Sequence, residues 1–187
     1  MLDTFLYKIK NWKAKLRAIT LGTTNQVDDG TGGVIVMRGT LAAKVIKANG
    51  KTTNLGIISE RVVTTAGVNF MRDDFNAATG GADITNVNFH DSGTGSVAEA
   101  IGDTDLGTVA GPVTRATGTQ SSPASKQYRS VGTISYSGTL AITEHGIFSS
   151  ATRGAGVLWD RSVFTAINVV SGDSIQFTYT LTINDGG

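Results

Sequence analysis

The 187-residue chain contains no cysteine, which excludes disulfide bonds, thiolate metal sites and cysteine nucleophiles. It also has no stretch near the ~20 consecutive apolar residues that a membrane-spanning helix needs. The formal net charge is only +1, so the chain as a whole is not built to neutralise a polyphosphate. We therefore expect neither a membrane nor a nucleic acid as its partner.

Proline is scarce as well, with two residues, whereas glycine is abundant, with 24. Together with many Thr and Ser residues, this composition is typical of a protein with many tight turns and pleated strands, not of a helical bundle. The length suits one sizeable core with an appended arm. The composition therefore predicts a mainly β protein with one domain.

The basic charge is concentrated at the N-terminus. Residues 1–20 contain five Lys or Arg and one Asp, a net charge of +4, which leaves 1 − 4 = −3 for the rest of the chain. Apolar residues recur at spacings of three and four, which predicts an amphipathic helical arm over residues 1–21. The interface expected on this arm consists of Leu2, Phe5, Leu6, Ile9, Trp12 and Leu16. Three uses stay open for it: packing on the chain's own body, docking on a neighbouring subunit, or contact with a membrane surface or nucleic acid.

A polar, glycine-rich connector is expected over residues 22–33, followed by a body over residues 34–187. The body contains a series of short strand-like runs, and Ser174–Ile183 alternates apolar and polar residues almost without a break. Thr64 or Thr65 can cap a short helix through Phe75. The pattern predicts an antiparallel β-sandwich or jelly-roll-like body. The expected strands are Val34–Met37, Thr40–Ile46 (with Arg38-Gly39 as a turn or bulge), Leu55–Val63, Ile84–Phe89, Arg115–Thr119, Tyr128–Ser137, Ala141–Phe148, Val157–Thr165 and Ser174–Ile183.

Two carboxylate-containing motifs look chemical but favour structural roles. Residues 89–94 place His90, Asp91 and Ser92 side by side, yet neighbours in a strand point to opposite faces and do not form a triad, so we expect a turn there. The glycine-rich residues 93–98 lack the Lys-Ser/Thr of a phosphate-binding loop. Asp103 and Asp105 could ligate Ca²⁺, but a structural turn is the preferred interpretation. The sequence thus predicts no catalytic, cofactor or metal site, and no enzyme.

Glu144 is the carboxylate of most interest. It lies in an expected strand next to apolar positions, and a buried carboxylate must be paired or neutralised. Arg161 on the next strand is the preferred partner, and Arg115 is the alternative. We expect a structural ion pair between Glu144 and Arg161, flanked by Trp159 and Phe164 as core or interface aromatics.

Four segments, taken in order, resemble a β-domain of tailed-bacteriophage virion proteins. They are residues 61–72 (Arg-Val-Val-Thr-Thr-Ala-Gly-Val-Asn-Phe-Met-Arg), residues 102–107 (Gly-Asp-Thr-Asp-Leu-Gly) followed by Arg115, residues 144–148 (Glu-His-Gly-Ile-Phe), and residues 158–183, which run from Leu-Trp-Asp-Arg through the last strand. The resemblance implies a short stand-alone structural protein or, more distantly, the attachment end of a tail fibre.

Because no shaft follows the last strand, we expect a capsid decoration or cement protein that binds the major capsid protein. It would be a homo-oligomer, with a trimer favoured, assembled in the host cytoplasm and located on the capsid surface of the virion. The alternatives are a tail, collar or baseplate adaptor and, in another class, a Ca²⁺-dependent carbohydrate-binding module.

Overall fold

The computed structural model describes residues 36–75 and 83–184. Residues 38–182 form one compact unit, which is the body, and the second unit, residues 1–37 with 183–187, lies almost wholly outside the described part. The predicted helical arm, its six interface residues and the glycine-rich connector are therefore outside the described residues.

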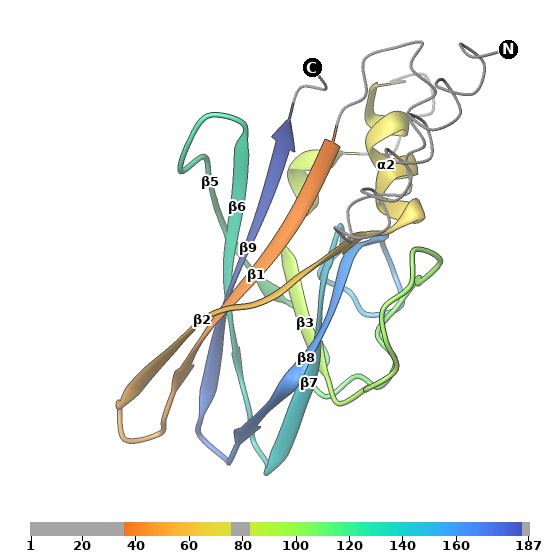
Figure 1. Ribbon diagram of the computed structural model, residues 1–187. Helices are drawn as coiled ribbons and strands as arrows, with labels where there is room; N and C mark the ends of the chain where they lie inside the picture. The colour runs from red at the N-terminus through yellow and green to blue at the C-terminus, as the bar shows by residue number, and fades with distance from the viewer. Residues whose placement is uncertain (1–35, 76–82, 185–187) are drawn as a thin grey trace, which may run out of the picture. The chain divides into compact units, whose positions relative to one another are not determined.

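The described chain is mainly β, as predicted, with two antiparallel sheets and one α-helix, α2 (Thr65–Phe75) (Figure 1). A 3₁₀ turn, η2 (Ile84–Asn86), precedes the third strand. The strands are β1 (Val36–Ile46), β2 (Thr52–Val63), β3 (Phe89–Gly93), β4 (Ala116–Thr117), β5 (Thr119–Ser121), β6 (Gln127–Ser135), β7 (Leu140–Phe148), β8 (Leu158–Val169) and β9 (Ser174–Asn184).

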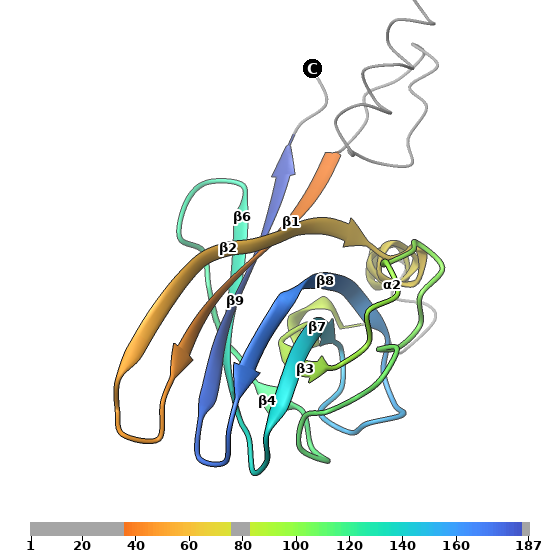
Figure 2. The same ribbon diagram turned by 60° about the horizontal axis from the view of Figure 1, so that its bottom comes forward.

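The strand β2 belongs to both sheets. Most of its length, Thr52–Arg61, pairs with β1, and this sheet continues through β9 and β6 to β5. Its last two residues, Val62 and Val63, pair with β8 of the other sheet, which continues through β7 and β3 to β4. Figure 2 shows β2 curving from one sheet to the other.

The core lies between the two sheets. On β9 the side chains of Ile175, Phe177, Tyr179 and Leu181 are buried, as the period-two pattern predicted. Phe177 packs against the ring of His145 on β7, with ring centroids 4.5 Å apart. Apolar side chains of one sheet therefore contact side chains of the other.

The helix α2 begins where the sequence predicted. The Thr64 side-chain oxygen accepts a hydrogen bond from the N–H of Gly67 at 3.0 Å, which confirms Thr64 as the N-cap. The same hydroxyl donates to the Leu158 carbonyl at 2.6 Å and so ties the cap to β8. The first turn of α2 packs closely against β8 at Gly67, where a Cβ would lie 2.7 Å from the Trp159 carbonyl oxygen, so only glycine allows this approach.

Three local predictions were wrong. Residues 115–119 were expected as one strand, but β4 and β5 divide this stretch and pair in different sheets. The second wrong prediction concerns β1. Arg38-Gly39 was expected as a turn or bulge, but β1 runs through both residues, and its register shifts against β2 lie further along, at Leu41/Ala42 and Ala43/Lys44. A Cβ on Gly39 would lie 2.4 Å from a carboxylate oxygen of Asp160, so the glycine permits a close approach between the two sheets.

Residues 84–93 also differ from the prediction. Ile84–Asn86 is a 3₁₀ turn capped by the Asp83 side chain, and the strand is β3, in the stretch that was predicted as a turn. The side chains of His90, Asp91 and Ser92 on β3 each have a hydrogen-bond partner inside the body.

Candidate functional site

The body contains several clusters of buried polar side chains, and Glu144 is at the centre of the first. Glu144 lies on β7 and is completely buried. Its carboxylate accepts hydrogen bonds from the backbone N–H groups of Gly95, Gly107 and Thr108 at 2.9, 2.9 and 2.7 Å. Arg161 on β8 donates two more, from Nε at 3.0 Å and Nη2 at 2.7 Å. The structure thus brings together the two residues that the sequence paired.

Arg161 extends this cluster into the 94–109 loop. Its Nη1 donates to Asp103 at 2.8 Å and its Nη2 to the Val97 carbonyl at 3.2 Å. Burial alone would raise the pKa of Glu144, but the hydrogen bonds from Thr108, Gly107 and Arg161 lower it on balance. Glu144 is therefore an ionised carboxylate that connects the 94–109 loop to β7 and β8. Both of its oxygens are fully occupied by hydrogen bonds.

The second cluster joins β3 to the loop between β7 and β8. Asp91 is buried and receives two side-chain donors of Arg153, with Nη2 3.1 Å from its Oδ1. Arg115 approaches Asp91 at an ion-pair distance of 3.5 Å, which is too long for a hydrogen bond from its Nε. Its guanidinium stacks 3.5 Å from the centroid of the Phe148 ring and donates to backbone carbonyls of residues 150–155. Arg115, the alternative partner for Glu144, is therefore engaged elsewhere.

The third cluster is a pair of buried histidines. His90 Nδ1 on β3 lies 2.9 Å from His145 Nε2 on β7, and His90 Nε2 lies 2.8 Å from the Ser130 hydroxyl on β6. Burial lowers the pKa of His90 to about 3 and lowers the pKa of His145 as well, so both rings are neutral. A Cβ on Gly132 would lie 2.5 Å from the His90 ring, so this glycine leaves room for the imidazole.

The fourth cluster links β8 to β9. Trp159 donates its indole N–H to the Tyr179 hydroxyl at 3.1 Å, and that hydroxyl donates to Asp160 at 3.3 Å. Burial raises the pKa of Asp160 well above its ordinary value, which favours the protonated carboxyl group in the folded state. Trp159 and Phe164, predicted as core or interface aromatics, are both buried.

Comparison with known proteins gives no match. No family model, no curated protein and no solved structure is similar to the chain. The arrangement of its own side chains is therefore the basis for any statement about function.

Asp103 and Asp105, the candidate Ca²⁺ ligands, are both engaged in hydrogen bonds within the protein. Asp103 pairs with Arg161 and also accepts the Ala100 N–H at 2.9 Å, and Asp105 accepts the N–H of Leu106 at 2.9 Å. Within residues 36–75 and 83–184, no three His, Asp or Glu side chains are grouped so that they could hold a metal ion. In the same part of the chain, no helix has the length and apolar character to cross a membrane.

Sequence reasoning missed the histidine pair and the Asp91 cluster. His90 and His145 are 55 positions apart, and only the pairing of β3 with β7 makes them neighbours. The side chains of His90, Asp91 and Ser92 have different partners. His90 contacts His145, Ser92 contacts Tyr136, and Asp91 accepts from Arg153 and from the backbone N–H of Ser92. A signal was present in the sequence, namely three successive polar residues between Phe89 and Gly93, but it also fits a turn.

Proposed function

We propose that this chain is a non-enzymatic structural component of a tailed-phage particle, namely a capsid decoration or cement protein that binds the major capsid protein. In this proposal the body is an antiparallel β-sandwich or jelly-roll-like unit. It assembles into a homo-oligomer, with a trimer favoured, and its arm docks on a neighbouring virion subunit.

One observation carries the proposal: three of the four segments that resemble the phage β-domain converge on one buried cluster. Residues 102–107 supply Asp103 and the Gly107 N–H, the segment at 144–148 supplies Glu144, and the segment from 158 supplies Arg161. These contacts join positions 17 to 58 residues apart. The spatial convergence supports reading the motifs as one structural set.

The burial and hydrogen bonding of the polar side chains support a structural, non-catalytic role. A catalytic acid, base or nucleophile must reach a substrate. Glu144 instead receives five hydrogen bonds, and the histidine pair lies wholly inside the body. These groups hold strands and loops in place, which is what a building block of a particle needs.

The test is the composition of purified particles from a phage whose genome encodes this chain. Quantitative mass spectrometry should find the chain in amounts comparable with the major capsid protein, as expected for a shell-covering protein. A single ring of copies would identify a tail, collar or baseplate adaptor instead. Absence from washed particles would contradict the proposal altogether.

A second test addresses the arm. Deleting residues 1–20 should leave a folded β body that no longer enters particles. Replacing Phe5 and Ile9 by Asp should have the same effect, whereas replacing Lys8 and Lys10 by Gln, on the polar side, is the matched control. If the truncated chain unfolds while the Phe5 and Ile9 variant is still incorporated, the arm serves the fold and the docking role is wrong.

A further inference from the structure

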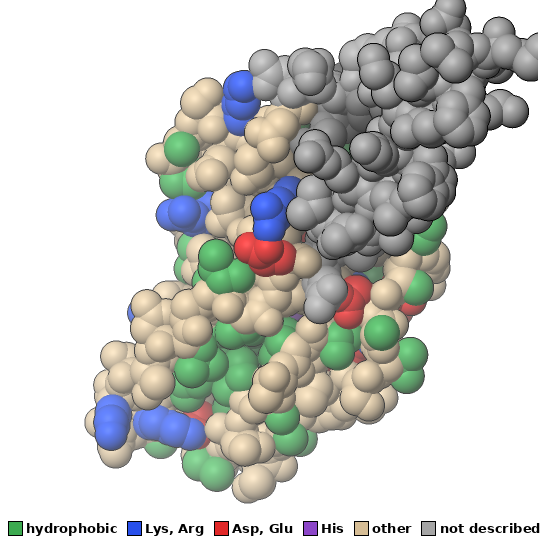
Figure 3. All heavy atoms as spheres, viewed as in Figure 1, with side chains coloured by type: hydrophobic (Ala, Val, Ile, Leu, Met, Phe, Trp, Pro, Cys, Tyr) green, Lys and Arg blue, Asp and Glu red, His purple; other side chains and the backbone are tan. Residues whose placement is uncertain are grey.

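The two sheets separate where β2 leaves β8. The pairs Val62↔Arg161 and Val63↔Asp160 are the whole ladder between these strands. Continued in register, the ladder would place Ile58 opposite Thr165. Instead these positions face an apolar hollow of about 310 Å³, visible among the green side chains in the lower half of Figure 3. Its lining residues are Leu55, Ile58, Thr165, Ala166 and Ile167.

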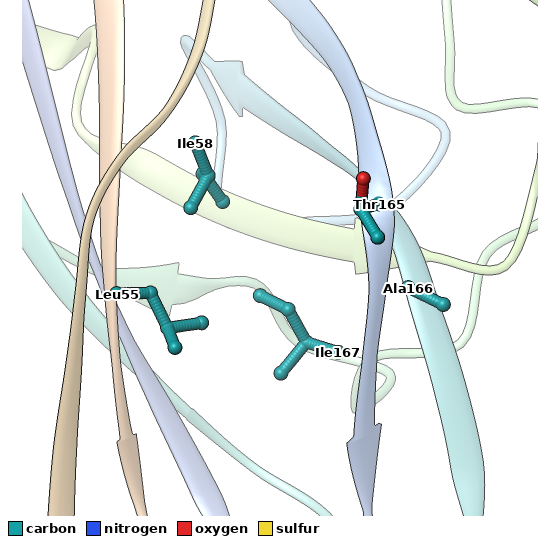
Figure 4. A pocket seen from close by; sticks show the side chains of 5 residues that line it. All are labelled: Leu55, Ile58, Thr165, Ala166 and Ile167. Atoms are coloured by element: carbon teal, nitrogen blue, oxygen red, sulfur yellow. The ribbon is translucent and has the colours of Figure 1, made fainter.

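Bulges in β2 explain part of the opening. One step along β1 from Leu41 to Ala42 corresponds to two steps along β2, from Ser59 to Ile57, so Ile58 is an extra residue. The same happens between Ala43 and Lys44, where Leu55 is the extra residue. A bulge bends its strand and redirects a side chain. Figure 4 shows Leu55 and Ile58 reaching from β2 toward Ile167 of β8.

The strand on the other side of the hollow, β8, is also irregular where it lines the hollow. Between Ile142 and Glu144 of β7 there are two steps, but between their partners Ile167 and Val163 on β8 there are four. The two extra residues fall in the stretch that contains Thr165 and Ala166, which are both exposed. Both walls of the hollow thus depart from regular pairing at the residues that line it.

The hollow has the chemistry of a strand-binding groove. Within the described residues, no strand pairs with the β8 edge of Ser162–Val169 on the side away from β7, or with the β2 edge of Thr52–Glu60 on the side away from β1. Such edges present main-chain N–H and C=O groups, which an extended polypeptide can satisfy. None of the five lining residues is charged, and Leu55 is 40% exposed, so the groove favours apolar side chains.

The chain itself contains a segment of matching chemistry. Residues 4–10 fit the helical spacing of the arm, but they also alternate, because Phe5, Tyr7 and Ile9 are separated by Leu6 and Lys8. In an extended conformation these three side chains would share one face, so bound residues 4–10 would be a strand instead of a helix. The 35 residues before Val36 lie outside the described structure and span up to ~120 Å when extended, which is enough to reach a neighbouring molecule. Residues 1–20 carry +4 and the remainder carries −3, so attraction between copies favours this contact.

We propose that residues 4–10 of a second copy of this chain insert as a β-strand between β2 and β8. The strand covers the apolar hollow and pairs with the free edges on both sides. Because donor segment and groove are different surfaces, the contact is heterologous and can close into a ring of copies. This inference concerns self-association and does not depend on membership in a virion.

The first experiment measures the oligomeric state of the full chain by light scattering over a range of concentrations. Ala166→Arg places a long charged side chain in the groove and should weaken association by roughly tenfold or more. The matched control is Ala141→Arg, an equally exposed alanine on the neighbouring strand β7, which should associate like the wild type. A wild type that is monomeric throughout, or equal behaviour of the two variants, would overturn the proposal.

The second experiment does not depend on how Ala166→Arg folds. The chain has no cysteine, so one introduced on each partner gives an unambiguous cross-link. Tyr7→Cys and an isotope-labelled Thr165→Cys are mixed and oxidised, and the expected product is a mixed disulfide dimer. A chain carrying both cysteines that links only within itself would show that its own arm fills the groove, and absence of any link would exclude the segment from it.

Discussion

At the scale of single residues, the stability of the body depends on buried charges that are fully hydrogen-bonded. A buried carboxylate is costly unless donors surround it. Glu144 has three backbone N–H donors and a guanidinium, whereas the Arg38–Glu60 pair is half exposed to water. The two pairs are the same chemistry in different surroundings, so they allow a controlled comparison.

We predict strong coupling between Glu144 and Arg161. Glu144→Gln should cost about 3 to 5 kcal/mol of unfolding free energy, because it leaves the Arg161 charge buried and turns an N–H₂ group toward backbone donors. Arg161→Met should cost less, because three backbone donors still hold the carboxylate. Denaturant unfolding of the singles and the double gives the cycle, and the double should be much milder than the sum.

The control for this cycle is Glu60→Gln, which should cost about 1 kcal/mol or less, since both partners of that pair are exposed. Strictly additive losses for Glu144→Gln and Arg161→Met would mean that the two side chains do not interact.

A second prediction concerns pH. His90 and His145 are neutral in the folded state but become charged in the unfolded state below about pH 6.5, so each makes stability fall on acidification, by at most about 1.4 kcal/mol per pH unit. Asp160 acts in the opposite direction, because burial raises the pKa of its carboxyl group in the folded state above the unfolded value of about 3.9. Stability should therefore fall between about pH 6 and pH 5, but less steeply than the two histidines alone would make it fall.

Variants separate these contributions. His145→Gln should make the slope of unfolding free energy against pH shallower, and Asp160→Asn should make it steeper. Urea titrations at several pH values measure the slopes. A slope that neither variant changes would show that these groups titrate alike in the folded and unfolded states.

At the scale of elements, the pattern of apolar residues was a good guide and the polar stretches were not. The alternation in β9 predicted the buried face from Ile175 to Leu181, because side chains of a half-buried strand point inward at every second residue, whereas Ile183 at the end of the strand is exposed. The strand β3 was missed, because its polar residues find partners on β6 and β7 and from arginines that are distant in sequence. Local pattern cannot supply such partners, nor can it reveal the bulges at Leu55 and Ile58, which depend on register with β1.

The ion pair of Glu144 was predictable for a related reason. A lone carboxylate in an apolar strand requires a cation, and the neighbouring strand offered one in Arg161. The three backbone donors were not predictable, since they come from a loop whose path only the fold determines.

The start of α2 gives a third prediction. Thr64→Val keeps the shape of the side chain but removes the hydroxyl that accepts from Gly67 and donates to Leu158, so it should cost about 1 to 2 kcal/mol. Thr64→Ser keeps the hydroxyl and is the control, with a smaller loss. Thermal unfolding measures both, and equal losses would show that the methyl group, not the cap, matters here.

At the scale of the whole body, one end is held by a carboxylate between hairpins. Asp173, in the β8–β9 turn, accepts from Lys47 at 2.7 Å and from the Ala48 N–H at 3.0 Å in the β1–β2 turn. Its backbone carbonyl accepts from Tyr136, just after β6. The hydrogen bond from Lys47 is the largest of the effects that lower the pKa of Asp173. Lysine and backbone groups connect these turns through Asp173, as arginine and backbone groups connect the loop and strands around Glu144.

The last prediction rests on that use of carboxylates, and it separates a structural protein from a Ca²⁺-dependent binding module. If Asp103 serves Arg161 and Asp105 serves its own turn, a chelator should change the melting temperature by no more than ~1 °C, and added Ca²⁺ should not raise it. A bound ion would stabilise the folded state by mass action, so a loss of several degrees with chelator would reveal one. Asp103→Asn completes the test: it should lower stability equally with and without chelator, because the partner it weakens is Arg161. An effect of this variant that disappears in chelator would instead identify Asp103 as a metal ligand.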